Sequence, residues 1–375
     1  MNVSPNDPSR RSASAGRRRG LWVVVSTVVL VAALAVLLVA KTHSPIQGNA
    51  GTTTTQSAPR RTAYSIGSPM LALKLTRLQM LTAQVGVGVA PIVTFSGGLL
   101  RGYLVGTNDG GASWTVTGVF PKGIYPWTTA FITPQVGYVI DSMGALFTDN
   151  AGRTWSKVTT SGGPLSVSVK GRVVWIAVEN CQQSAMQGHC STRIDAYKVG
   201  GLVPTSVASV PQDQPVFSQI GPTAGYAFGS GGISGKVYVT ANSGRSWHSI
   251  ANPCASGQIS GASAASSTRL FLYCELGPTT VLNSSSDGGA TWQRQSESPG
   301  NGLGAAVGSS GAFLWQFTPA LWESGDGGRS WTPVSGVKYG PSGDIVTYGA
   351  HEAWHAVPGH GIYWTLNGTS WELLK

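Results

Sequence analysis

Short stretches in which apolar and polar residues alternate fill most of the chain after residue 70, and turn-forming residues separate them. The clearest unit has four such stretches, at 129–132, 137–140, 145–148 and 154–158. Alternation over such short lengths predicts β-strands joined by tight turns. Strands equivalent to the second of these four are expected at 173–178, 225–228, 270–273, 312–315 and 353–357.

One eight-residue motif recurs between these strands, with the pattern Ser/Thr-x-Asp/Asn-x-Gly-x-Ser/Thr-Trp. It reads TNDGGASW, TDNAGRTW, TANSGRSW, SSDGGATW and SGDGGRSW, and a shortened copy reads TLNGTSW. Its acidic or amide position holds Asp109, Asn150, Asn242, Asp287, Asp326 and Asn367. Its final position holds Trp114, Trp155, Trp247, Trp292, Trp331 and Trp371.

The motif has the chemistry of a tight turn between two strands. An Asp or Asn side chain accepts hydrogen bonds from nearby backbone N–H groups, and glycine adopts the positive φ that other residues resist. The tryptophan begins the next strand and buries a large ring. Because asparagine replaces aspartate in three copies, the negative charge is dispensable. We therefore interpret the motif as structural rather than catalytic or metal-binding.

The spacing of the motif predicts the architecture. The intervals between the tryptophans are 41, 92, 45, 39 and 40 residues, and the long interval is two periods with one degenerate copy near Val199-Gly200-Gly201. Seven units of four antiparallel strands predict an all-β, seven-bladed β-propeller over 71–375. We expect the last strand, at 370–374, to belong to a blade that closes the ring against the first blade, with help from 71–75.

These motifs resemble the Asp-box (BNR) repeat of sialidases, sortilin-type receptors, certain glycoside hydrolases and the photosystem II assembly-factor propellers. The motifs cover about 105–375 of the chain. The resemblance implies the propeller fold and says little about function, because unrelated activities share the repeat. The arginine triad and Arg-Ile-Pro element of sialidases have no match in this chain, which argues against sialidase activity.

Composition supports an all-β chain and directs attention to the N-terminus. Only 11% of residues are charged and 51 are glycine, which disfavours disorder, coiled coils and helical bundles. Residues 1–20 carry five arginines and one aspartate, whereas 71–375 has 17 basic and 14 acidic residues out of a net +10. A nucleic-acid partner is therefore not expected, because such binders concentrate basic charge on the folded surface.

An uncharged stretch at 21–40 follows three consecutive arginines. A helix of that length spans about 30 Å, the thickness of a bilayer core. The positive-inside bias places 1–20 in the cytoplasm as a basic tail. We expect an uncleaved single-pass anchor in the cell membrane, a flexible stalk at 41–70, and a propeller outside the cytoplasm. A cleaved signal peptide is the alternative.

The chain has four cysteines, all beyond the expected anchor. An even number outside the cytoplasm predicts disulfides. We expect the pairs Cys181–Cys190 and Cys254–Cys274, because each closes a short loop; four buried free thiols are the alternative.

A match to the zinc-protease pattern H-E-x-x-H occurs at His351, Glu352 and His355. On a helix such histidines share one face and can bind one zinc ion. The repeat, however, predicts a strand at 353–357, where residues four apart are separated by about 13 Å. We therefore expect no metal site here and no cofactor elsewhere.

Two functional hypotheses remain for the loops of the propeller. Three aromatic residues lie in the connection that carries Phe120, Lys122, Tyr125 and Trp127, a composition enriched at interfaces. This favours a non-enzymatic scaffold that recognises an extracytoplasmic protein or glycan, although Trp127 could also simply fill a gap between blades. The alternative is a polysaccharide-acting hydrolase that uses the carboxylates ending second strands, namely Asp141, Glu179 and Glu275.

Overall fold

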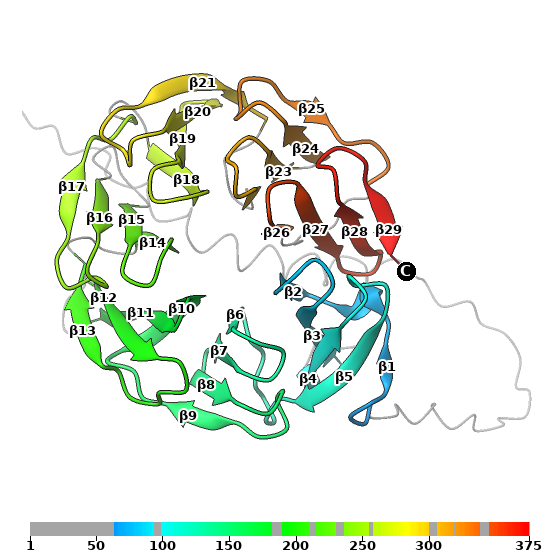
Figure 1. Ribbon diagram of the computed structural model, residues 1–375. Coiled ribbons are helices and arrows are strands. Elements are labelled where there is room, and N and C mark those ends of the chain that lie inside the picture. Colours follow the sequence, from blue (N-terminus) through cyan, green and yellow to red (C-terminus); the bar gives the residue numbers. More distant parts are fainter. Residues whose placement is uncertain are drawn as a thin grey trace, which may run out of the picture. The chain divides into compact units, whose positions relative to one another are not determined.

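The computed structural model describes residues 64–93, 99–181, 190–210, 215–229, 236–254, 258–299, 306–318, 320–337 and 345–374. These residues belong to one compact unit, Thr62–Lys375. Their strands form seven antiparallel sheets arranged around a central axis (Figure 1). The predicted seven-bladed β-propeller is confirmed.

Blades 2 to 7 are meanders of four consecutive strands, with the first strand next to the axis, and in blade 1 the strands β2–β5 follow the same order. Blade 1 also carries a short 3-10 helix, η1 (Ala72–Lys74), and an additional outer strand. The strands of blades 1 to 4 are β1 Pro69–Met70, β2 Arg77–Met80, β3 Gly86–Val93, β4 Leu99–Thr107 and β5 Trp114–Val119; β6 Thr128–Phe131, β7 Gly137–Asp141, β8 Gly144–Thr148 and β9 Ser156–Val158; β10 Gly163–Lys170, β11 Val173–Cys181, β12 Cys190–Lys198 and β13 Ser206–Ser209; β14 Pro215–Gln219, β15 Gly225–Gly229, β16 Val237–Thr240 and β17 His248–Ile250.

Blades 5 to 7 follow the same order, and their last blade ends at the C-terminus of the described chain. Their strands are β18 Gln258–Ala264, β19 Leu270–Leu276, β20 Thr279–Ser285 and β21 Gln293–Ser298; β22 Ala306–Val307, β23 Leu314–Thr318, β24 Ala320–Ser324 and β25 Thr332–Pro333; β26 Ile345–Tyr348, β27 Glu352–Val357, β28 Gly361–Thr365 and β29 Glu372–Leu374.

The starts of the predicted second strands agree closely with the structure. Strands β11, β15 and β19 begin at the predicted residues, and β27 begins one residue early, at Glu352. The larger shift is in β23, which begins at Leu314 instead of residue 312. The delay has a local cause: Gly311 adopts a φ of 69°, and the Ala312 N–H bonds the Ser310 hydroxyl at 3.2 Å. The turn therefore extends two residues further than the hydrophobic pattern suggested.

The second strands are buried on both faces, which explains why they are so apolar. In β7, Tyr138 and Ile140 pack in a cluster with Val174 of blade 3, whereas Val139 between them packs in a cluster with Leu104 of blade 1. Alternate residues of one strand thus fill the two neighbouring interfaces. Polar side chains join the inner strands: Gln79 of β2 donates to the Phe131 carbonyl at 2.9 Å and accepts from the Phe131 N–H at 2.8 Å.

Blade 7 closes the ring against blade 1 without exchanging a strand. Its sheet contains only β26–β29, and blade 1 contains only β1–β5. One core cluster joins Trp354 and Ile362 of blade 7 to Ala72 and Leu75 beside η1. The Trp354 indole also donates to the Gly110 carbonyl at 2.9 Å, across 244 positions of sequence. The predicted contribution of 71–75 to closure is therefore confirmed.

Part of the predicted stalk belongs to the propeller. The Gly67 N–H donates to the Val116 carbonyl at 2.8 Å, and Pro69–Met70 form the strand β1 on the edge of β5. Tyr64 packs edge-on against Tyr103 with ring centroids 5.6 Å apart, and it accepts a hydrogen bond from Lys74. The folded unit begins earlier than residue 71 because Tyr64 has an aromatic surface to bury.

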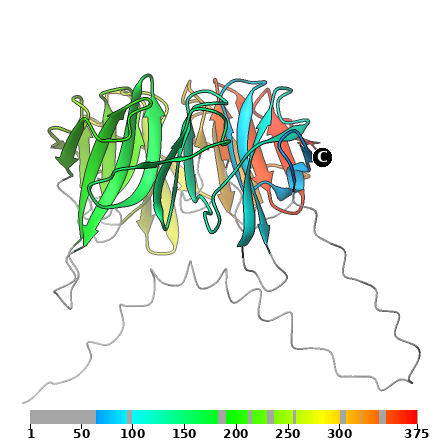
Figure 2. The same ribbon diagram turned by 90° about the horizontal axis from the view of Figure 1, so that it is seen from below.

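The antiparallel blades create two faces, seen edge-on in Figure 2. We call the loop face the end where the last strand of one blade leads into the first strand of the next. The β3–β4, β11–β12 and β19–β20 hairpins extend furthest at this end, on the lower side of Figure 2. The opposite end, which carries the turn motifs, is the motif face.

Within the described ranges, no helix is both long and apolar enough to cross a membrane. The predicted basic tail at 1–20 and anchor at 21–40 lie outside those ranges, as does the stalk up to residue 63.

Candidate functional site

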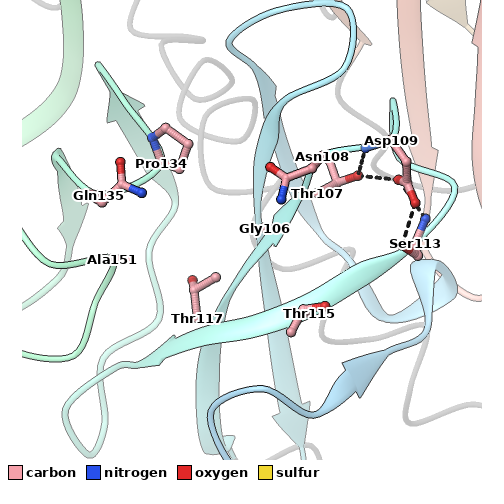
Figure 3. Close-up of a pocket in the computed structure, with 10 residues that line it drawn as sticks. All are labelled: Gly106, Thr107, Asn108, Asp109, Ser113, Thr115, Thr117, Pro134, Gln135 and Ala151. Atoms are coloured by element: carbon pink, nitrogen blue, oxygen red, sulfur yellow. Dashed lines mark hydrogen bonds between the residues drawn. The ribbon is translucent and has the colours of Figure 1, made fainter.

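The turn motif of blade 1 is held together by its own side chains (Figure 3). The Thr107 hydroxyl donates to Asp109 Oδ1 at 2.7 Å and accepts from the Gly111 N–H at 3.0 Å. The Ser113 N–H and hydroxyl donate to Oδ1 and Oδ2 of Asp109, at 2.9 and 2.5 Å. Partial burial raises the pKa of Asp109, but these hydrogen bonds outweigh it and lower the pKa to about 2.

Motifs with asparagine form the same turn. Asn150 Oδ1 accepts from the Thr148 hydroxyl at 3.1 Å and from the Thr154 N–H at 2.9 Å, and its amide donates to the Thr154 hydroxyl at 2.7 Å. An amide therefore replaces a carboxylate without loss of a hydrogen bond. This geometry agrees with the interpretation that the charge is dispensable.

Several motif tryptophans connect their blade to the preceding one. The indole N–H of Trp155 donates to the Val119 carbonyl at the end of blade 1, at 3.0 Å. Trp292 reaches the Ala251 carbonyl at 2.8 Å, and Trp331 reaches the Ser296 hydroxyl at 3.1 Å. The tryptophan thus supplies both apolar surface and a hydrogen bond at an interface between blades.

A cavity of about 380 Å³ opens beside the blade 1 motif. It lies on the motif face, between the β4–β5 hairpin of blade 1 and two turns of blade 2 (Figure 3). Its lining combines polar and apolar surface in similar amounts. Seven of the lining residues carry a hydroxyl, amide or carboxylate group, namely Thr107, Asn108, Asp109, Ser113, Thr115, Thr117 and Gln135, and the others are Gly106, Pro134 and Ala151.

The loop face of blades 2 and 3 carries four exposed apolar side chains. Tyr125 and Trp127 are each 40% exposed, Leu165 is 37% exposed and Met143 is 72% exposed. We call these four residues the loop-face patch. The Trp127 indole donates to the Leu165 carbonyl at 3.0 Å. Trp127 therefore bridges two blades, as its gap-filling alternative proposed, and still presents a large part of its ring to solvent.

The other residues predicted for binding differ in position. Lys122 is exposed in the same connection. Phe120 is buried, with its ring centroid 5.0 Å from that of Trp155, inside the cluster between blades 1 and 2. The structure thus places Phe120 in the core, because the connection folds its first aromatic ring inward before reaching the surface at Tyr125.

The three carboxylates of the hydrolase hypothesis lie on different blades. Asp141 ends β7 and is only 3% exposed; its Oδ1 accepts from the Met143 N–H at 2.8 Å. Glu179 lies in β11 of blade 3, and Glu275 lies exposed in β19 of blade 5. The described geometry brings no pair of them onto one sheet.

The H-E-x-x-H pattern lies at the start of a strand, as predicted. Glu352 and His355 belong to β27, and His351 precedes it in the turn. His355 is fully buried, whereas His351 is exposed and packs edge-on against Phe313 at 4.7 Å. Extended backbone separates the two histidines, so the face-sharing of a zinc-binding helix does not arise here.

One predicted disulfide is confirmed. Cys254 and Cys274 are bonded and tie the connection after β17 to β19. The backbones of Cys181 and Cys190 lie directly opposite each other at the end of the β11–β12 ladder. The side chains of this second pair lie outside the described part of the structure.

Comparisons with known proteins support the fold. No protein-family model and no curated protein matches the chain. Solved structures that resemble it include YCF48 bound to a D1 peptide, with 16% identity, a TM-score of 0.53, and coverage of 82% of this chain and 98% of that one.

Two enzymes also contain a similar fold. For an ancestral GH74 enzyme the identity is 14%, the TM-score 0.56 and the coverage 83% of this chain and 48% of that one. For a Mycobacterium tuberculosis puromycin-hydrolyzing peptidase the identity is 10% and the TM-score 0.57, with coverage of 83% of this chain and 56% of that one. This chain spans about half the length of either enzyme. At such identities the likeness establishes the class alone: a seven-bladed β-propeller.

Sequence reasoning missed two members of the loop-face patch and the whole cavity. Met143 and Leu165 occupy a turn and a strand start that looked ordinary in isolation. The cavity does have a signal in the sequence: Gly106 precedes the first motif position, where the other motif copies have Phe147, Val239, Ser284, Glu323 and Trp364.

Proposed function

We propose that this chain is a membrane-anchored, extracytoplasmic propeller that recognises another protein through its loop face and performs no chemistry. The loop-face patch carries this proposal. Tyrosine, tryptophan and methionine are enriched at protein interfaces. A side chain that is already held in place contributes more to the binding free energy, because it loses less conformational entropy when the partner binds. Trp127 is held in this way, because its backbone carbonyl accepts from Arg77 and its indole donates to Leu165.

Three further observations support this reading. The YCF48 structure shows a related fold with a bound D1 peptide, so such a propeller can hold a peptide segment. The uncharged stretch at 21–40, after three arginines, supports an anchor that keeps the propeller next to the membrane. The turn motifs and their hydrogen bonds support membership of the Asp-box group.

The hydrolase alternative rests on the fold of the GH74 enzyme and on the acids Asp141, Glu179 and Glu275. A retaining or inverting glycosidase needs two carboxylates about 5–9.5 Å apart across one sugar. Release of reducing sugar from xyloglucan, abolished by Glu179→Gln or Glu275→Gln, would favour this alternative over recognition.

The recognition proposal is tested by quantitative capture of partners from solubilised membranes of the native cell. Trp127→Ala and Tyr125→Ala are expected to reduce recovery of a specific partner at least tenfold, because each removes an exposed aromatic ring from the patch. Tyr348→Ala is the matched control, since Tyr348 is also 40% exposed but ends the inner strand β26 on the motif face.

Thermal unfolding of each variant separates loss of binding from loss of folding. Equal recovery of all partners by Trp127→Ala, Tyr125→Ala and Tyr348→Ala, with unchanged Tm, would contradict the proposal.

A further inference from the structure

The cavity beside the blade 1 motif borders a glycine at a position where the other intact copies of the motif carry a side chain. Gly106 lies in β4, one residue before the first residue of the motif, and Thr117 lies in β5, three residues after the motif tryptophan. A Cβ atom on Gly106 would lie only 3.2 Å from the Thr117 methyl group, so the two residues already face each other closely. The other motif copies place larger pairs here, namely Phe147 and Val158, Val239 and Ile250, Ser284 and Gln295, Glu323 and Val334, and Trp364 and Leu374.

Those larger pairs fill the corresponding space. Phe147 and Val158 belong to the core cluster between blades 2 and 3, and Trp364 and Leu374 pack against the cluster that closes the ring. In blade 5, the Gln295 amide donates to the Ser284 hydroxyl at 2.9 Å. Blade 1 has no such side chain at Gly106, and a cavity of about 380 Å³ lies beside it.

The chemistry of the lining restricts the ligand. No lysine or arginine is among the residues that line the cavity, so an anion would find no compensating charge. Asp109 has a pKa of about 2 and is ionised at every physiological pH. Its Oδ2 accepts from the Ser113 hydroxyl, and a carboxylate oxygen has capacity for a further donor. A hydroxyl group of a neutral ligand satisfies that capacity without adding charge.

The remaining groups match a polyhydroxylated molecule. Asn108 and Gln135 have exposed side-chain amides, each with donors and an acceptor, at opposite sides of the opening (Figure 3). Thr115 adds a hydroxyl, and the Pro134 ring offers an apolar surface for the face of a sugar. The volume lies at the low end of the ~300–1,000 Å³ typical of small-molecule sites, which suits a short saccharide.

We propose that this cavity, between blades 1 and 2 on the motif face, binds a short neutral carbohydrate. The site lies on the face opposite the loop-face patch, so it is independent of the protein partner proposed above. Together the two sites would allow the propeller to hold a protein on one face and a glycan on the other.

The experiment uses the full chain in a detergent without sugar groups, which avoids competition from the detergent itself. Tetrasaccharides of β-1,4-linked N-acetylglucosamine, β-1,4-linked glucose and α-1,6-linked mannose are titrated separately by calorimetry and ligand-observed NMR. We expect saturable binding of at least one of them. Absence of binding by all three would overturn the proposal, as would preferential binding of a short lysine-containing peptide.

Two variants locate the site. Gly106→Val introduces the residue that blade 4 has at this position and is expected to weaken saccharide binding at least tenfold. Because the new Cβ atom would lie 3.2 Å from the Thr117 methyl group, thermal unfolding is measured alongside to separate loss of binding from loss of folding. Gln135→Ala is expected to weaken saccharide binding at least threefold.

Gln84→Ala is the matched control. The Gln84 carbonyl accepts from the Gly110 N–H in the blade 1 motif, just as the Gln135 carbonyl accepts from the Ala151 N–H in the blade 2 motif, but Gln84 is not among the residues that line the cavity. Saccharide binding that all three variants retain equally would place the ligand elsewhere and overturn the assignment.

Discussion

Each turn motif is organised by a single hydroxyl, which donates to the Asp or Asn side chain and accepts from the backbone of the tightest part of the turn. In blade 5, the Ser285 hydroxyl donates to Asp287 Oδ1 at 2.7 Å and accepts from the Gly289 N–H at 2.8 Å. Hydrogen bonds from Thr291 and Ser285 lower the pKa of Asp287 from 3.8 to about 2. The negative charge of the aspartate is thus not needed for the turn, because the neutral amide of Asn150 accepts the same hydrogen bonds.

The lowered pKa makes a prediction about acid stability. Asp287 stabilises the folded state fully above pH 4, and this contribution is lost as the pH falls from 3.8 towards 2. Asp287→Asn is expected to unfold with a Tm that varies less over this window than that of the wild type. Asp149→Asn, an exposed aspartate in the second motif, is the control. Identical pH profiles for Asp287→Asn and the wild type would contradict the prediction.

Glu323 has the opposite electrostatic environment. Partial burial beside blade 7 raises its pKa from 4.5 to about 7, and a contact with the Trp371 indole opposes this only partly. The folded state therefore binds a proton between pH 4.5 and 7 that the unfolded chain has lost. Stability contributed by this group is complete below pH 4.5 and declines as the pH rises through 7.

We expect Glu323→Gln to remove that decline, because the amide keeps the shape of the protonated acid. The variant should gain a few degrees in Tm over the wild type at pH 8 and show little difference at pH 4. Thermal unfolding at both pH values measures the effect, with the exposed Glu297→Gln as control. A gain of equal size at both pH values would show that titration of Glu323 is not its cause.

At the scale of elements, the interfaces between blades depend on contacts that one blade makes with the next. The indoles of Trp155, Trp292 and Trp331 donate to the preceding blade. The second strand β7 divides its side chains between two clusters. The Cys254–Cys274 disulfide also links two successive blades, because it bonds the connection that leaves blade 4 to the second strand of blade 5.

Removal of this disulfide is therefore expected to be costly. With a sequence separation of 20 residues, the loss should be about 3 kcal/mol of unfolding free energy. Cys254→Ala combined with Cys274→Ala, compared with the wild type by urea denaturation under oxidising conditions, tests this. Reducing agent should lower the stability of the wild type and leave that of the double variant unchanged. A loss well below 1 kcal/mol would show that the blade 4–5 connection is held by packing alone.

At the scale of the whole molecule, the interface between blades 7 and 1 contains an additional segment. The residues around η1 lie in the core between these two blades. Leu75 is fully buried there, beside Gly88 of β3. The closure of the ring thus depends on residues that precede the first blade's inner strand.

Leu75→Ala is expected to destabilise the propeller by about 2–5 kcal/mol, the range for truncating a buried leucine. Leu71→Ala is the matched control, because Leu71 belongs to the same segment but is exposed and should change stability by about 0.5 kcal/mol or less. Equilibrium denaturation measures both. Equal effects of the two substitutions would mean that this segment does not hold the closure together.

Periodicity and turn chemistry are local properties, and they were enough to predict the architecture. The motif tryptophans, the spacing of about forty residues, the strand that carries His355 and the pairing of Cys254 with Cys274 all follow from residues near one another in sequence. The turns depend on side chains and φ angles within a few positions, and the disulfide joins cysteines 20 residues apart, so a comparison along the chain was enough.

Burial depends on which blades meet, and only the tertiary structure decided it. Phe120 and Tyr125 are five residues apart and both aromatic, yet one fills a core and the other faces solvent. Trp127 and Leu165 come from a connection and a strand that meet only when blades 2 and 3 pack together. In the sequence, Gly106 is one glycine in a strand. In the folded ring it lies opposite blade 2 and offers no side chain for packing, and a cavity lies beside it.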